Sequence, residues 1–197
     1  VDAPRLFDAI ADAAVANIHD FNAQNLANAA WAFATAAVDA PRLFDAVAGA
    51  AQRRVREFNV QDLANTAWAF AKAGVDAPQL FDAIARAAQP RLGEFIEQDL
   101  ATLAAWAVAT AGVDAPRFFE AIAKEAQPRL REFDSQEFAN TAWAFAKAGV
   151  DAPQLFDAIA RAAQPRLGEF IEQDLATLAA WAVATAGVDA PRFFEAI

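Results

Sequence analysis

Apolar residues recur along the chain at intervals of three and four, the spacing that places them on one face of an α-helix. The residues between 75 and 112 show this pattern twice, which predicts two helices joined by a short turn. The stripe of the first helix consists of Leu80, Phe81, Ile84, Ala88, Leu92 and Phe95. The second helix of the preceding segment has a matching stripe at Leu63, Ala67 and Phe70. Neither helix can bury such a stripe alone, so we expect the pairs to pack on one another.

The two-helix pattern is an internal repeat. The tetrapeptide VDAP begins at 1, 38, 75, 113, 150 and 188, and residues 64–122 recur unchanged at 139–197. This predicts an all-α fold, an α-solenoid of five stacked helix–turn–helix repeats plus a partial sixth, right-handed by analogy with other helical-pair solenoids. We expect the chain to be a piece of a longer array. The predicted boundaries are 1–37, 38–74, 75–112, 113–149, 150–187 and the partial 188–197.

The helix ends carry their own signals. An aspartate and a nearby proline open each first helix, which predicts side-chain N-caps at Asp39, Asp76, Asp114 and Asp151. Prolines farther along are expected to kink that helix or split off its last turn, at Pro90, Pro128 and Pro165. An Asn or Asp followed by an acid three residues later predicts capping boxes at Asn59 with Asp62 and at Asp134 with Glu137. Glycines are expected to end the second helices, at Gly74, Gly112, Gly149 and Gly187.

Repeats 3 and 5 have one extra residue in the second helix, where they read QDLATLAAWAVATAG. On a straight helix, an insertion between Thr102 and Trp106 would turn everything beyond it by about 100°. We therefore predict a π-type bulge there, or an N-cap shifted by one residue. Ile96 is a poor N-cap, which leaves the second alternative open.

Each second helix also predicts a polar stripe that contains a tryptophan. Residues at i, i+4, i+7 and i+11 share one side of a helix. In repeat 2 these positions hold Gln61, Asn65, Trp68 and Lys72; in repeat 4 they hold Gln136, Asn140, Trp143 and Lys147; in repeat 1 they hold Gln24, Asn28, Trp31 and Thr35. The tryptophan could pack on the neighbouring repeat or offer its indole to a ligand, and packing is the interpretation that we favour.

The frame around this tryptophan resembles the octotricopeptide repeat family and its heptatricopeptide relatives. Segments such as QDLANTAWAFAKAG and QEFANTAWAFAKAG, in units of 37 or 38 residues, carry the resemblance over the whole chain. Members of these families are typically imported into chloroplasts or mitochondria, where they bind RNA or support organellar ribosomes. The resemblance implies framework positions at Asn28, Trp31, Asn65, Trp68, Trp106, Asn140, Trp143 and Trp181.

Charge gives a mixed picture. The formal net charge is −10, whereas a dedicated phosphate binder usually presents a basic stripe. One basic position nevertheless recurs in four successive repeats, and we call its members the repeat arginines: Arg54, Arg91, Arg129 and Arg166. Our hypothesis is that RNA contacts these arginines, supported by Lys72 and Lys147. The alternative is that they form an ordinary solvated face.

Catalytic chemistry is not predicted. The chain has no Cys, one Ser (Ser135) and one His (His19), so no nucleophile–base pair or metal-ligand cluster can be drawn, and no cofactor is implied. We expect His19 to interact with a helix end. The longest apolar run, near 103–113, is too short to cross a membrane. Two non-enzymatic functions remain open: an organellar RNA-binding factor, or a protein–protein scaffold within a large assembly.

Overall fold

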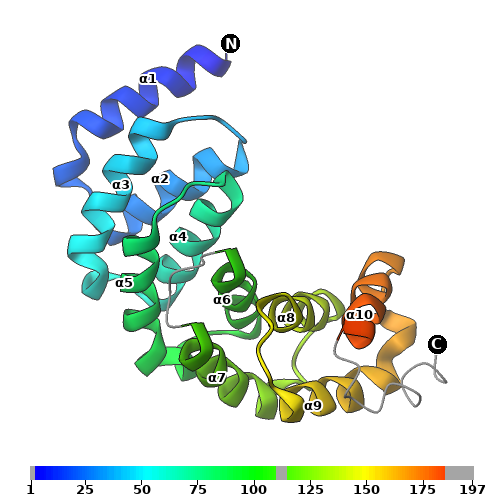
Figure 1. The fold of residues 1–197 in the computed structure, drawn as a ribbon. Helices are drawn as coiled ribbons and strands as arrows, with labels where there is room; N and C mark the ends of the chain where they lie inside the picture. The colour runs from blue at the N-terminus through cyan, green and yellow to red at the C-terminus, as the bar shows by residue number, and fades with distance from the viewer. Residues whose placement is uncertain (1–2, 110–114, 185–197) are drawn as a thin grey trace. The chain divides into compact units, whose positions relative to one another are not determined.

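The computed structural model describes residues 3–109 and 115–184, and within these ranges the regular structure is entirely helical. The chain divides into two compact units, Val1–Arg91 and Leu92–Ile197. The first unit contains α1 (Ala3–Ala16), η1 (Ile18–Asp20), α2 (Ala23–Thr35), α3 (Pro41–Arg54), η2 (Val55–Glu57), α4 (Val60–Ala73) and α5 (Pro78–Ala88) (Figure 1). A 3-10 helix, η3 (Gln89–Glu94), contains the division between the units.

The second unit continues the alternation of first and second helices, beginning with a second helix. It contains α6 (Glu97–Ala109), α7 (Ala115–Ala126), η4 (Gln127–Arg129), α8 (Ser135–Ala148), α9 (Pro153–Ala163), η5 (Gln164–Glu169) and α10 (Glu172–Ala184). The connections between described helices are short, as at 36–40, 74–77 and 149–152. The prediction of helix pairs without strands is therefore confirmed for the described residues.

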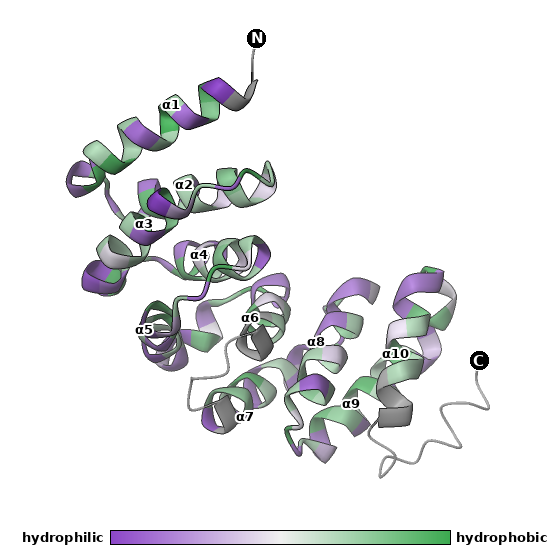
Figure 2. Cartoon of the chain, turned by 45° about the horizontal axis from the view of Figure 1, so that its top comes forward, coloured by the Kyte–Doolittle hydropathy of each residue, from purple (hydrophilic) through white to green (hydrophobic). Residues whose placement is uncertain are grey.

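Helices of the same kind in successive repeats pack side by side within each unit. In the first unit α2 packs on α4, while α3 packs on α1 and α5; in the second unit α8 packs between α6 and α10. Figure 2 shows α2 beside α4, and α8 beside α10. Buried phenylalanines join the first and second helices, as in the edge-to-face contacts of Phe44 with Phe70 and of Phe119 with Phe145. Neighbour-to-neighbour packing is what a solenoid requires. The solenoid itself and its handedness stay predictions, and the partial sixth repeat lies outside the described residues.

The start of each second helix follows the sequence prediction. Asn59 and Asp134 are N-caps whose side chains accept from the backbone N–H groups of Asp62 and Glu137, and both capping boxes are complete. The helix ends follow it too: Gly74 and Gly149 adopt left-handed conformations, with φ of 65° and 64°. Gly112 and Gly187 lie outside the described residues.

The predicted aspartate caps at Asp39, Asp76 and Asp151 are wrong. These helices begin at Pro41, Pro78 and Pro153, so the N-cap is the preceding alanine, and it makes no side-chain cap hydrogen bond. Proline disfavours helical dihedrals in the residue before it, which makes the alanine the last non-helical position. Asp39, Asp76 and Asp151 therefore lie one residue too early, and Asp114 lies outside the described residues.

The predicted break near the end of the first helix is confirmed, but proline is not its only cause. The last turn becomes a 3-10 helix at η3, η4 and η5, which contain Pro90, Pro128 and Pro165. The same change occurs at η1 and η2, which contain no proline. The break is thus a property of the repeat, and proline is one residue compatible with it.

Neither predicted adjustment to the extra residue of repeat 3 occurs in the backbone. The α6 helix runs unbroken from Glu97 to Ala109 without a π-type turn. Its first turn also keeps its register, because the Leu100 N–H donates to the Ile96 carbonyl as the Leu63 N–H donates to that of Asn59. Counted from the helix start, the extra residue therefore moves Trp106 to the position that Ala69 occupies in α4. The side chains of Trp106 and Trp181 lie outside the described residues.

Two buried threonines offer a test of this packing. Thr66 and Thr141 hold equivalent positions in α4 and α8, and each buries a hydroxyl that has no hydrogen-bond partner. Thr141→Val removes that hydroxyl at nearly constant shape. We expect the free energy of unfolding to rise by about 1 kcal/mol, measured by chemical denaturation. Thr177→Val is the matched control, because the Thr177 hydroxyl already donates to the Gln173 carbonyl. An equal gain in both variants would contradict the explanation.

Candidate nucleic-acid interface

Three of the repeat arginines connect their own repeat to the one before it. The Nη1 atom of Arg91 donates to the backbone carbonyl of Phe58 at 2.8 Å, and that of Arg166 donates to the carbonyl of Phe133 at 2.7 Å. Arg54 makes the equivalent bond to Phe21. Each acceptor lies 33 residues before its arginine, in the short connection between the first and second helices. A charged donor on a backbone carbonyl is among the stronger hydrogen bonds of a protein.

Nearby carboxylates hold two of these guanidinium groups. Arg54 pairs with Glu57 at 2.7 Å, and Arg166 pairs with Glu169 at 3.0 Å. The hydrogen bond from Arg54 holds the pKa of the Glu57 carboxyl below its ordinary value. A glutamate of the same repeat thus orients each of these two arginines, while the guanidinium donates to a carbonyl of the preceding repeat.

Arg129 departs from this pattern at the lengthened repeat. The extra residue of repeat 3 places Arg129 one position farther from Phe95, and its guanidinium pairs with the Glu97 carboxylate instead. Burial raises the pKa of Glu97, but hydrogen bonds from its own backbone and from Arg129 outweigh this and leave that pKa below its ordinary value. The Nη1 atom of Arg129 is buried without a hydrogen-bond partner. The extra residue therefore changes the partner of the arginine and leaves the helix unbroken.

These contacts give the repeat arginines a structural role that the sequence did not suggest. They lie at the end of the first helix or in the 3-10 turn that follows it, and their side chains are partly covered, with 32% of Arg54 and 29% of Arg166 exposed. A contact between them and RNA stays a prediction. The signal that could have found their role is the fixed separation of 33 residues from a phenylalanine.

The polar positions of the second helices lie along one side of each helix, and we call this set of positions the tryptophan stripe. It consists of Gln24, Asn28, Trp31 and Thr35 on α2; Gln61, Asn65, Trp68 and Lys72 on α4; and Gln136, Asn140, Trp143 and Lys147 on α8. Trp31 is 45% exposed and Trp143 is 41% exposed, so these rings are open to solvent on one side even where they contact the neighbouring repeat. Trp68 is half-buried beside Trp31, with ring centroids 6.4 Å apart.

Lysine accompanies the tryptophan in two of the three helices. The Nζ atom of Lys72 lies 5.8 Å from the ring centroid of Trp68, and that of Lys147 lies 5.5 Å from the ring centroid of Trp143. Both distances fit a cation–π contact within one helix. The pair places an ammonium group and an indole face on the same exposed patch, next to the amides of Asn65 and Asn140. Aromatic faces with adjacent cations are what single-stranded nucleic-acid binders use.

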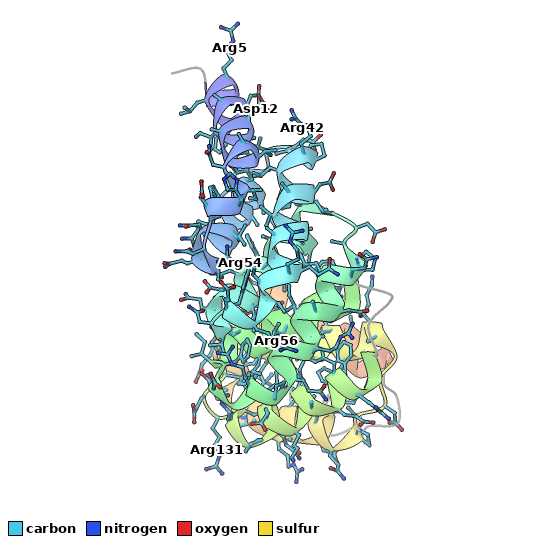
Figure 3. The ribbon with its side chains drawn as sticks, turned by 90° about the vertical axis from the view of Figure 1, so that its left-hand side faces the viewer. Arg5, Asp12, Arg42, Arg54, Arg56 and Arg131 are labelled. Atoms are coloured by element: carbon cyan, nitrogen blue, oxygen red, sulfur yellow. The ribbon has the colours of Figure 1, made fainter. Side chains whose placement is uncertain are left out.

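The tryptophan stripe is almost free of acidic charge, although the chain as a whole is acidic. The α2 helix has no charged residue, and the only acids of α4 and α8 are Asp62 and Glu137, whose side chains accept from the N-cap backbone. Asp62 is 6% exposed, and burial raises the pKa of Glu137. Acids elsewhere lie on other elements, as in the exposed pair of Asp12 on α1 with Arg42 on α3 (Figure 3).

The α6 and α10 helices differ from this pattern. They begin with Glu97 and Asp99 and with Glu172 and Asp174, and they contain no lysine. A surface that combines tryptophan and lysine is therefore restricted to repeats 2 and 4, with repeat 1 supplying an uncharged version. The framework asparagines lie on this surface as well: Asn28 and Asn140 are exposed and Asn65 is half-buried.

The described residues show no arrangement for catalysis or metal binding. His19 lies in η1 with its Nε2 atom 3.3 Å from the Asp20 carboxylate, and both side chains are exposed. Residues 3–109 and 115–184 hold no group of three or more His, Cys, Asp or Glu side chains that could bind a metal ion. In the same part of the chain, no helix combines the length and apolar character needed to cross a membrane.

Comparison with known proteins gives a family. The model of the family described as RESC6, RNA-editing substrate-binding complex 6 protein, matches residues 52–185. The chain belongs to this family. The matched region contains α4 and α8, which carry the lysines of the tryptophan stripe, and all four repeat arginines. No curated protein matches the chain. The octotricopeptide resemblance stays an expectation from the sequence.

The structural role of the repeat arginines can be tested against an adjacent arginine. Arg54→Gln removes the charged donor to the Phe21 carbonyl and the partner of Glu57, so we expect the melting temperature to fall by several degrees. Arg56→Gln is the matched control, since Arg56 is exposed and lies two positions away (Figure 3). Equal melting temperatures for the two variants would contradict the structural role.

Proposed function

We propose that this chain is a non-enzymatic RNA-binding subunit of an RNA-editing type of complex, and that it holds RNA on the tryptophan stripe. The observation that carries the proposal is the pairing of half-buried Trp68 with exposed Lys72 and of exposed Trp143 with exposed Lys147, on helices whose only acids cap the helix start. Base stacking on indoles and phosphate contact by lysine together supply most of the affinity of sequence-tolerant RNA binders. Membership of a family named for RNA-editing substrate binding agrees with this assignment.

The proposal changes which basic residues contact RNA. Lys72 and Lys147 remain from the sequence hypothesis, whereas the repeat arginines act by holding successive repeats in register. A guanidinium that already bonds a carbonyl and a carboxylate has few donors left for phosphate. Direct RNA contact by the arginines is therefore the weaker alternative, and the variants below separate it from contact by the lysines.

The organelle is part of the proposal. RNA-editing complexes of this family are mitochondrial, which favours the mitochondrion over the chloroplast. The octotricopeptide resemblance points to the same kind of compartment. The repeats would then act as a stacked solenoid that presents RNA to other proteins of the assembly.

A scaffold that binds only protein is the alternative function. The observation in its favour is a repeated exposed isoleucine: Ile96 is 54% exposed and Ile171 is 57% exposed, each just before a second helix. Exposed apolar side chains at regular positions suit protein contacts. The net charge of −10 also suits a partner that is basic.

Lysine reversal tests the RNA function. We expect Lys72→Glu with Lys147→Glu to weaken binding of a single-stranded RNA oligonucleotide and to reduce the slope of log affinity against log salt by about 0.7 per lost contact. The measurement is a fluorescence anisotropy titration at several salt concentrations.

Lys124→Glu on α7 is the matched control, because it makes the same charge change on a first helix. It should leave the salt slope unchanged. A smaller slope of log affinity against log salt in the control, with an unchanged slope in the double variant, would contradict RNA contact at the tryptophan stripe. A wild-type chain that binds no RNA would favour the protein-scaffold function.

A further inference from the structure

Trp31 and Trp68 form a pair of indoles from successive repeats. They lie at equivalent positions of α2 and α4, which pack side by side. Their ring centroids are 6.4 Å apart and their planes are inclined by 34°. Trp31 is 45% exposed, so the pair opens to solvent on one side.

The spacing of the two rings is close to what a stacked base needs. Bases stack about 3.4 Å apart, so a base held between two parallel rings requires about 6.8 Å. The observed centroid distance lies within the range of aromatic rings in direct contact, so a base can enter only if the two side chains turn until the inclined rings are parallel and a few tenths of an ångström farther apart. Trp31 is 45% exposed, so one of the two rings keeps a large part of its surface available to a base.

The surroundings of the pair suit a nucleotide more than an apolar ligand. The same faces of α2 and α4 carry the amides of Gln24, Asn28 and Gln61, which can bond base edges. Lys72 lies 5.8 Å from the ring centroid of Trp68, within reach of a phosphate next to a stacked base. The nearest acid in sequence, Asp62, bonds the Asn59 backbone N–H and so turns away from this surface.

We propose that Trp31 and Trp68 hold one unpaired base of a single-stranded RNA between their rings, with Lys72 on an adjacent phosphate. This rests on the proposed RNA-binding function and specifies its ligand. A base within a duplex has both faces covered by its neighbours, so it cannot enter between the two rings without being unstacked. The site therefore selects single strands, loops or unpaired ends over double-stranded RNA.

The test compares three RNA probes and a set of tryptophan variants. The probes are a single-stranded oligonucleotide of about 12 nucleotides, the same strand paired with its complement, and the same strand with abasic positions throughout. The wild-type chain should bind the first probe at least tenfold more tightly than the other two. The abasic probe keeps every phosphate, so its loss of affinity reports base stacking and does not depend on the folding of any variant.

Trp31→Ala and Trp68→Ala should each weaken binding of the single strand by about tenfold, in line with the loss of one stacking contact. The double variant should bind little more weakly than either single variant, because a sandwiched base needs both rings and the two losses are then not additive. Trp31→Phe should retain most of the affinity. Circular dichroism and melting temperature check that each variant is folded.

The outcomes separate this inference from the broader function. Additive losses in the double variant would show two independent platforms and overturn the sandwich. Equal binding of the abasic probe, or of the duplex, would overturn it as well while leaving RNA binding by Lys72 and Lys147 in place. A wild-type chain that binds none of the probes would overturn the proposed function itself, and retention of a protein partner through Trp31 would then identify the stripe as a protein contact.

Discussion

The hydrogen bond from a repeat arginine to the carbonyl of the preceding repeat is the interaction on which the rest of the structure depends. It joins the end of one first helix to the junction that precedes the second helix of the repeat before it, as Arg91 does with Phe58. Because these junctions are tied together, successive second helices start in register. This places Trp31 and Trp68 at the same level on α2 and α4, with rings 6.4 Å apart. The repeat arginines, which the sequence suggested as RNA contacts, therefore align the second helices that carry the tryptophan stripe.

An acidic composition is compatible with the proposed RNA binding because charge is sorted by helix. The second helices of repeats 1, 2 and 4 keep acids only at the capping box, where Asp62 and Glu137 neutralise backbone donors. The first helices and the 3-10 turns carry exposed acids, including Asp12 and Glu57, where they pair with arginine. A net charge of −10 therefore describes the whole chain and not the face that would meet phosphate.

The sequence predicted features that depend on local chemistry and missed those that depend on distant partners. The capping box at Asn59 and the left-handed Gly74 follow from residues within one turn. Three aspartate caps failed for an equally local reason, since the alanine before the proline is the N-cap of α3, α5 and α9. The acceptor of Arg54 lies 33 residues away, and the exposure of Trp31 depends on what packs beside α2, so neither could be read from periodicity.

The central claim is that RNA contacts the tryptophan stripe while the repeat arginines hold the repeats together. Photo-crosslinking of the full chain to single-stranded RNA, followed by mass spectrometric mapping of the crosslinked residues, tests it most directly. The account predicts crosslinks on α2, α4 and α8, at or beside Trp31, Trp68 and Trp143. Crosslinks concentrated at the 3-10 turns around the repeat arginines, with the second helices unmodified, would contradict it.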